Sequence, residues 1–404
     1  MESRTSDNMR AIALSNQADV VIVGSGFTGA TYAYELAKQG FKVLVIDKRD
    51  HLAGNAYTER KNGIDVHKYG AHIFHTPNKE IWDYVNTFGY FNDYRHKVLA
   101  NSGGKIYSLP FTLKTMSEIF ERGFEPHQAR HFLETKIAND MLDHKIDIPS
   151  NLAEKAISLV GYKIYETLIQ TYTKKQWNVD PQLLDQSIIT RLPVRFNYNT
   201  DYFNDRYQGI PVDGYTKLIE NMICDRRYIQ TVTGVDYFDI RDEMSKKPFV
   251  IYTGPIDKYF DYKFGKLAWR SVRFNTIEML DIDDALGTSV MNYCDNSTPY
   301  TRAIEHKHFN PLHGARGTIV SFEQSCEPDE ANGIDPYYPI DLKEQRDILK
   351  QYNELKDLAD HRVHICGRLG DFKYYDMHQA IGIVLKQVRD VQNRVISHLS
   401  EKEI

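Results

Sequence analysis

The spacing of apolar and polar positions predicts a β-α-β unit near the start of the chain. Residues 19–23 (DVVIV) form a short β-branched run that stops at a glycine-rich turn, residues 24–29. Residues 30–38 then have the composition of a helix, and a second β-branched run, 42–46, closes on an aspartate. A strand, glycine turn, helix and strand within about thirty residues are typical of a dinucleotide-binding unit.

The pattern then changes twice along the chain. Residues 81–168 contain amphipathic, helix-like segments and few strand runs, which predicts a helical insert. Strand-like pieces at 229–232, 249–253 and 318–322, separated by turn signals, predict a mixed antiparallel sheet. A strand at 363–366 and a long final helix then predict that the C-terminal part folds back to complete the nucleotide-binding domain. The fold class expected is therefore α/β.

The glycine turn has the spacing that a pyrophosphate requires. Gly24 and Gly26 permit a tight turn and a close backbone approach, and Gly29 lets the helix pack on the strand, so that a pyrophosphate can lie at the helix N-terminus. Asp47 stands eighteen residues after Gly29, where it can accept the ribose hydroxyls. A plain glycine turn without a ligand is the alternative interpretation.

The continuation of this unit favours FAD over NAD. Residues 47–55 (DKRDHLAGN) resemble the second phosphate-contacting loop of flavoproteins similar to amine oxidases. We therefore expect FAD as the cofactor.

Charge and cysteine spacing exclude several classes of protein. The chain has 50 Lys and Arg against 55 Asp and Glu, a net charge of −5, so neither nucleic acid nor an anionic membrane is an expected partner. Local arginines must then meet any anionic ligand. The four cysteines are far apart and include no CxxC pair, so no metal site is predicted and a reducing, cytoplasmic location is expected.

Hydropathy gives no sign of membrane insertion. No run of about eighteen apolar residues occurs, so no membrane span is expected. Residues 1–17 lack the apolar core of a secretory signal and are interpreted as a disordered or vector-derived lead.

Longer motifs resemble one family along nearly the whole chain. Residues 66–76 (VHKYGAHIFHT) are similar to the histidine-bearing loop of the bacterial UDP-galactopyranose mutases. Six further blocks resemble the same family in the same order: 172–177 (YTKKQW), 191–196 (RLPVRF), 209–215 (GIPVDGY), 252–257 (YTGPID), 305–309 (EHKHF) and 367–370 (GRLG).

The resemblance implies a discontinuous FAD-binding Rossmann-like domain with a small helical domain and an antiparallel β-sheet domain. The implied boundaries are 18–80 with about 205–265 and 345–404 for the first, about 81–170 for the second, and about 171–204 with 266–344 for the third, which includes a mobile loop. A homodimer is implied in the same way.

The implied reaction interconverts UDP-galactopyranose and UDP-galactofuranose with no net redox change. The N5 atom of reduced FAD attacks the anomeric carbon and displaces UDP, so an external reductant such as NAD(P)H is needed. The resemblance assigns catalysis to Arg191 and Arg302, which stabilise the departing UDP, and to His72 near the flavin. A purely structural role is the alternative for His72.

The same resemblance assigns the remaining site residues. Expected substrate contacts are Tyr172, Thr173, Trp177, Tyr202, Asn101, Tyr337, Tyr374 and Asp376. Expected FAD contacts are Gly24, Gly26, Phe27, Gly29, Asp47, Lys48, Gly54, Asn55, His72, Gly367, Arg368, Asp376 and Met377. His67 and His75 are interpreted as structural, and Arg195 is as well explained by a surface or fold-stabilising role.

Departures from the family pattern leave the sugar open. Ala53, Ala56 and Ala71 replace a glycine, a cysteine and a proline that are usual in the family, and none removes a group that the reaction needs. Tyr375 stands where leucine is usual and is a candidate for a changed sugar preference. A mutase for UDP-N-acetylgalactosamine or dTDP-fucose is the main alternative, followed by an amine-oxidase-like oxidoreductase and an inactive sugar-nucleotide sensor.

Overall fold

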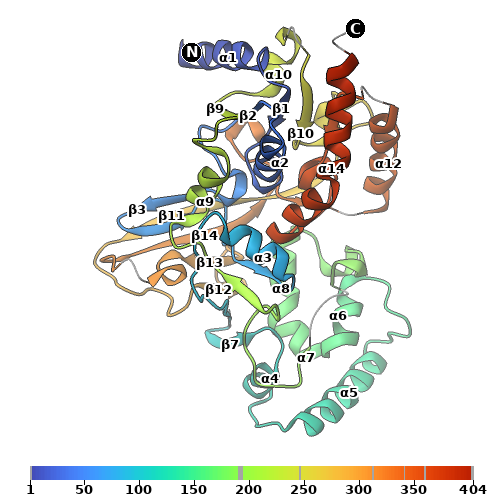
Figure 1. The fold of residues 1–404 in the computed structure, drawn as a ribbon. Coiled ribbons are helices and arrows are strands. Elements are labelled where there is room, and N and C mark those ends of the chain that lie inside the picture. Colours follow the sequence, from blue (N-terminus) through green and yellow to red (C-terminus); the bar gives the residue numbers. More distant parts are fainter. Residues whose placement is uncertain are drawn as a thin grey trace.

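The computed structural model describes residues 2–189, 194–244, 247–311, 314–340, 342–358 and 361–401. A parallel sheet with its helices lies at one end of the molecule, a helical unit lies at the other, and a larger sheet runs between them (Figure 1). None of the helices in these ranges has the length and apolar character needed to cross a membrane.

The first unit is built on a five-stranded sheet in which every neighbouring pair is parallel, in the order β16-β10-β1-β2-β9. Its strands are β1 (Val20–Val23), β2 (Val43–Asp47), β9 (Ile229–Thr233), β10 (Phe249–Tyr252) and β16 (Val363–Ile365). The expectation that 229–232 and 249–253 join an antiparallel sheet is therefore wrong. β10 (FVIY) is apolar almost throughout because parallel strands are covered on both faces.

Helices cover both faces of this sheet. Val20 and Ile22 belong to the core beneath α2 (Phe27–Lys38), α9 (Gly214–Ile223) and α14 (Met377–Glu401), whereas Val21 belongs to the core on the opposite face. α2 and α14 lie side by side (Figure 1). The opposite face carries α1 (Glu2–Ser15), α10 (Tyr237–Ile240), α11 (Ile256–Tyr259) and α12 (Lys343–Leu358).

The beginning of the chain is helical, in contrast to the disordered lead that was expected. Ala11 on α1 is fully buried, and Ile12 and Leu14 pack against the same core. α1 contacts β9, β2 and α10. The short apolar segment near residue 11 was too brief to stand out in the sequence, but the sheet supplies a surface on which it is buried.

The larger sheet has seven strands in the order β15-β11-β14-β13-β12-β6-β7. The strands are β6 (Val98–Ser102), β7 (Lys105–Leu109), β11 (Trp269–Met279), β12 (Val290–Tyr293), β13 (Arg302–Glu305), β14 (Thr318–Cys326) and β15 (Tyr338–Pro339). All pairs are antiparallel except β12 with β6, which is parallel. The sheet is therefore mixed.

The helical unit is smaller than the expected range 81–170. Its core comes from α4 (Leu113–Phe120), α5 (Pro126–Asp143), α6 (Leu152–Val160), α7 (Tyr162–Ile164), a π-helical turn (Tyr165–Ile169) and α8 (Gln170–Trp177). β6 and β7 join the seven-stranded sheet instead, and α3 (Lys79–Asn86) packs through Ile81 and Val85 into the core of the parallel-sheet unit. Long-range pairing decided these placements.

Two small antiparallel sheets complete the frame. One pairs β3 (Thr58–Lys61) with β4 (Ile64–His67). The other pairs β5 (Phe74–Thr76) with β8 (Tyr207–Gly209) and sets His75 opposite Gln208.

Candidate active site

A cavity of about 490 Å³ lies where the three units meet. One wall is formed by the glycine turn after β1 and the loop after β2, and the opposite wall by side chains of β6, β12, β13 and α8. The N-terminus of α14 and residues 335–338 close the remaining sides. A cavity of this size at the carboxyl ends of parallel strands is the usual location of a ligand in such a fold.

Backbone contacts explain two of the glycines in the turn. Gly24 has φ +100°, and a Cβ there would lie 2.2 Å from Oγ1 of Thr253. A Cβ on Gly29 would lie 1.9 Å from the carbonyl oxygen of Gly24. The turn therefore requires glycine at both positions, and α2 begins directly behind it at Phe27, with its first N–H groups unpaired within the helix.

Asp47 is held at the end of β2 by hydrogen bonds from the turn. Its Oδ2 accepts from the backbone N and the Oγ of Ser25, at 2.8 and 2.6 Å, and its Oδ1 accepts from the backbone N of Arg49 at 3.0 Å. Asp47 is 6% exposed and lines the cavity. This position beside the glycine turn fits the ribose of a dinucleotide.

An ion-pair group joins the loop after β2 to the segment of residues 335–338. Asp335 accepts from Nζ of Lys48 at 2.5 Å and from Nη2 of Arg49 at 2.6 Å. Burial raises the pKa of Asp335, but Arg49 and Lys48 outweigh it and leave the pKa lowered. Arg49, which the sequence analysis did not single out, also lies over the Tyr69 ring at 4.2 Å. The group holds the chain that carries Tyr337.

His72 has a fixed tautomer. Its Nδ1 lies 2.7 Å from the carbonyl oxygen of Gly70, so Nδ1 carries the proton and Nε2 is left as an acceptor. Burial lowers the pKa of His72 to about 4 against the opposing hydrogen bond to Gly70, and Arg368 and Arg302 lower it further. The imidazole is therefore neutral at pH 7 in the wall of the cavity.

Arg302 enters the cavity from β13. Its Nε donates to Oε2 of Glu323 on the neighbouring strand at 2.7 Å. Burial disfavours the charge on Arg302, but Glu323 and the nearby Tyr172 and Tyr338 outweigh this effect and raise its pKa well above the usual value. Arg302 is a permanent cation that faces an enclosed site.

Arg368 is a second cation in the same cavity, and it lacks a counter-ion. Within the part of the chain that the structure describes, Arg368 forms no ion pair with a carboxylate. Burial lowers its pKa, opposed by Tyr338, Tyr374 and Tyr337. A half-buried guanidinium without a carboxylate partner is unfavourable unless an anion binds beside it, so Arg368 indicates an anionic ligand.

Most of the predicted site residues line this one cavity. They are Gly24, Gly26, Phe27, Gly29, Asp47, Lys48, Gly54, Asn55, His72, Tyr172, Tyr202, Arg302, Tyr337, Arg368, Tyr374, Asp376 and Met377. Thr173, Trp177, Asn101 and Gly367 do not line it. Thr173 is buried on α8, the carbonyl of Trp177 accepts from Nη2 of Arg270, and Gly367 packs on Thr28. Arg191 lies outside the described residues.

Strand alternation explains why Asn101 misses the cavity. Val98 lines it, and a residue three positions further along β6 points to the other face of the sheet. The side chain of Asn101 instead accepts from the backbone N of Gly104 in the hairpin turn at 3.2 Å. Asn292 on β12, which pairs with Ala100, lines the cavity. Only the register of β6 and β12 reveals this residue.

The structure also shows the surroundings of Arg195, Tyr375 and His75, for which the sequence led to different expectations. Arg195 donates to the carbonyl oxygens of Asp201 and Tyr202, which supports a fold-stabilising role. The OH of Tyr375 donates to Oδ2 of Asp371 at 3.1 Å, and Tyr375 also lines the cavity. His75, interpreted as structural, lies in the cavity wall as well.

Comparisons with known proteins agree with this geometry. Residues 167–374, slightly more than half of the chain, match the family model described as UDP-galactopyranose mutase, and residues 22–88 match an NAD(P)-binding Rossmann-like domain. The chain is 39% identical to a dTDP-fucopyranose mutase of Escherichia coli over 90% of its length and 95% of the relative's.

Two further relatives extend the comparison. A probable UDP-galactopyranose mutase of Klebsiella pneumoniae is 37% identical over 92% of this chain and 94% of its own. A crystal structure of reduced UDP-galactopyranose mutase superimposes with a TM-score of 0.69 at 14% identity, covering 94% of this chain and 96% of that one, which shows a common fold.

Proposed function

The chain belongs to the UDP-galactopyranose mutase family and is a flavin-dependent isomerase, and on this premise we propose that it interconverts UDP-galactopyranose and UDP-galactofuranose. We propose FAD in its reduced form as the cofactor. Bound in the cavity, reduced FAD supplies the electron pair that attacks the anomeric carbon of the sugar.

The glycine turn at residues 24–29 and the loop after β2 fit this cofactor. Gly24, Gly29 and the N-terminus of α2 leave room and free N–H groups for a pyrophosphate, and Asp47 is placed for a ribose. Asn55 and Met377 also line the cavity, where they would hold the rest of the cofactor.

The arginines supply the electrostatic part of the reaction. Arg302, fixed by Glu323, and Arg368, which lacks a carboxylate partner, would bind the diphosphate and stabilise the charge that grows on it as it leaves. Tyr337 and Tyr374 line the same region and can donate hydrogen bonds to phosphate oxygens. Tyr172 and Tyr202 present aromatic surface on which a uracil can stack.

His72 contributes orientation and hydrogen bonding without a charge. Because Nδ1 donates to the carbonyl of Gly70, Nε2 can accept a hydrogen bond from a donor group of a ligand in the cavity. A neutral imidazole adds no further positive charge beside Arg302 and Arg368, so it does not compete with them for the diphosphate.

The observation that carries this proposal is that Arg302 and Arg368 line the same cavity as the glycine turn at residues 24–29. An oxidoreductase that removes hydride from apolar amines has no need of two arginines in its cavity. A sugar nucleotide, whose diphosphate carries two negative charges, fits such a site.

The sugar and the nucleotide have a second candidate. A relative named dTDP-fucopyranose mutase is 39% identical over nearly all of both chains, close to the 37% of the UDP-galactopyranose relative. We therefore propose interconversion of the two ring forms of dTDP-fucose as the alternative activity of the same site.

Turnover of the chemically reduced protein tests both proposals. UDP-galactofuranose, UDP-N-acetylgalactosamine and dTDP-fucose are supplied separately, and the ring forms are separated by chromatography with oxidised protein as a control. Conversion only after reduction supports the mutase, and the ratio of kcat/KM values identifies the sugar nucleotide. Absence of a ring change with every substrate refutes the proposed activity. The cytoplasmic location, the homodimer and the external reductant stay predictions.

A further inference from the structure

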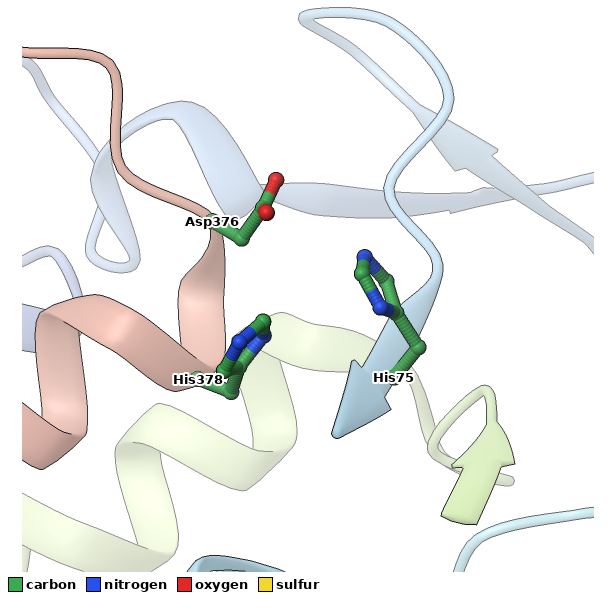
Figure 2. Close-up of side chains that lie close together, drawn as sticks. All are labelled: His75, Asp376 and His378. Carbon is green, nitrogen blue, oxygen red and sulfur yellow. The ribbon is translucent and has the colours of Figure 1, made fainter. Parts of the chain in front are cut away.

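Three side chains from two segments that are far apart in the sequence surround one point in the cavity wall (Figure 2). His75 comes from β5, Asp376 precedes α14, and His378 lies in the first turn of α14. One nitrogen of each imidazole and one carboxylate oxygen all lie within 4.8 Å of one another. Two imidazoles and one carboxylate form a ligand set that transition metals prefer.

His75 is oriented by a carboxylate behind it. Its Nδ1 lies 2.5 Å from Oδ2 of Asp205, and its ring stacks on Phe203 with centroids 3.7 Å apart. This contact leaves Nε2 as the nitrogen available to a ligand. A carboxylate hydrogen-bonded to the far nitrogen of a histidine is the usual support of a metal-binding imidazole.

His378 has a nitrogen with nothing to bind. Its Nδ1 is buried and has no hydrogen-bond partner among the described residues. The His378 ring centroid lies 5.2 Å from that of His75.

Two other groups of similar composition occur in the described part of the chain, and both are occupied by protein contacts. In Asp284, Glu305 and His308, the Glu305 carboxylate already accepts from two backbone N–H groups and from Thr318. In His361, His398 and Glu401, Nε2 of His398 is hydrogen-bonded to the carbonyl of Lys247. In the cavity group, by contrast, Nδ1 of His378 has no hydrogen-bond partner among the described residues.

We propose that His75, His378 and Asp376 bind a zinc ion in the wall of the active-site cavity. Bonds of about 2.0–2.2 Å in a tetrahedral shell place ligand atoms roughly 3.4 Å apart, so the three side chains move slightly inward on binding. The fourth position faces the cavity and is filled by water. The sequence predicted no metal because its cysteines are far apart and include no CxxC pair.

Zinc at this point regulates the site, and this consequence rests on the proposed function. Asp376 is one of the residues expected to contact substrate and FAD, and the metal withdraws its carboxylate into the coordination shell. The ion also occupies space beside Tyr374 and Met377 that a sugar nucleotide requires. Zinc therefore acts as a reversible inhibitor that a chelator removes.

Calorimetric titration of the tag-free, FAD-loaded protein with zinc chloride tests the site without relying on turnover. We expect one zinc per chain, at least tenfold weaker binding in His378→Ala, and binding weakened about 10–100-fold in Asp205→Asn, which loses the support of His75. His361→Ala and His308→Ala, which alter the two occupied groups, serve as matched controls and bind zinc as the unaltered protein does.

A further variant guards against loss of folding. His378→Asp replaces one metal ligand by another. With both variants fully loaded with FAD, we expect His378→Asp to bind zinc more tightly than His378→Ala does. Equal affinity in His378→Ala, or no saturable binding, overturns the site. Zinc that binds but leaves turnover unchanged overturns the regulatory consequence. A protein that binds zinc through His378 but converts no sugar nucleotide refutes the proposed function and leaves the metal site standing.

Discussion

Arg302 and Glu323 are direct cross-strand partners on β13 and β14, and their side chains meet with Nε 2.7 Å from Oε2. The register of the sheet thus fixes the direction in which the guanidinium enters the cavity. Glu323 is 5% exposed, so water does not compete strongly for this contact.

Removing this support should reduce turnover while the arginine remains present. Glu323→Gln replaces a charged hydrogen bond, and we expect a loss of about 2 kcal/mol of transition-state stabilisation, roughly thirtyfold in kcat/KM. FAD content should not change. Glu278→Gln, which removes a partner of Lys61 at the surface, is the matched control. Unaltered kinetics in Glu323→Gln would contradict the positioning of Arg302.

Removing the charge of Arg302 itself should lower kcat/KM more than altering Glu323 does. Arg302→Ala is expected to lower kcat/KM about a hundredfold or more, because the diphosphate loses a donor that acts as its charge grows. Arg226→Ala removes an exposed arginine that lies over Tyr34 and should leave kinetics unchanged. Steady-state assays of reduced protein provide the measurement, and equal rates in the two variants would rule out the role.

Arg368 should oppose stability when no ligand is present. Arg368→Met removes a half-buried cation that has no carboxylate partner among the described residues, and we expect the ligand-free protein to become more stable by about 1 kcal/mol. Binding of UDP should weaken in the same variant. Denaturant titration and calorimetry measure the two effects. A variant that is less stable and binds UDP normally would show that Arg368 is structural.

Two substitutions in the glycine turn distinguish a steric effect on folding from an effect on cofactor binding. Gly29→Ala places a Cβ 1.9 Å from the Gly24 carbonyl and should destabilise the protein even without FAD. Gly26→Ala meets no atom within 4 Å and should leave the ligand-free protein as stable as before. We expect it to lose FAD affinity, because the added methyl group stands where the pyrophosphate approaches. Flavin absorbance and thermal unfolding distinguish the two variants.

Buried histidines should make the protein sensitive to acid. Burial lowers the pKa of His306 and of His364 from 6.5 to about 3. The unfolded chain therefore takes up protons below pH 6.5 that the folded chain does not, so stability is fully present above pH 6.5 and is lost as the pH falls toward 3. Each such group contributes up to about 1.4 kcal/mol per pH unit. We expect Tm to fall steadily from pH 6.5 to 4.

A variant isolates this effect. His306→Asn cannot gain the charge and should show a flatter dependence of Tm on pH, whatever its stability at pH 7. His127→Asn, at an exposed position, should keep the original slope. Parallel slopes for the two variants would exclude His306 as a source of acid sensitivity.

The local sequence was sufficient to predict the glycine turn and Asp47 as a nucleotide-binding site. The turn at Gly24 and Gly29, the helix behind it and Asp47 lie within one short segment, and each has a backbone or hydrogen-bonding reason that can be expressed in sequence terms. The histidine and arginine motifs were long enough to indicate His72 and Arg302, which do line one cavity.

Other features depend on contacts between distant segments. β6 and β7 follow a helix and precede a run of helices, and only the pairing of β6 with β12 places this hairpin in the larger sheet. The choice of Asn292 over Asn101 as a cavity residue follows from that same pairing. The meeting of His75 with His378 requires β5 and the start of α14 to be adjacent, which neither segment encodes alone.

The contact between α2 and α14 has a consequence during synthesis on the ribosome. α2 leaves the ribosome soon after β1, but the helix that covers it is the last element described in the chain. The apolar side of α2 therefore stays uncovered by α14 until that later helix has been synthesised. Premature termination before α14 would leave a nascent chain with a complete glycine turn and an exposed core, a suitable substrate for chaperones and proteases.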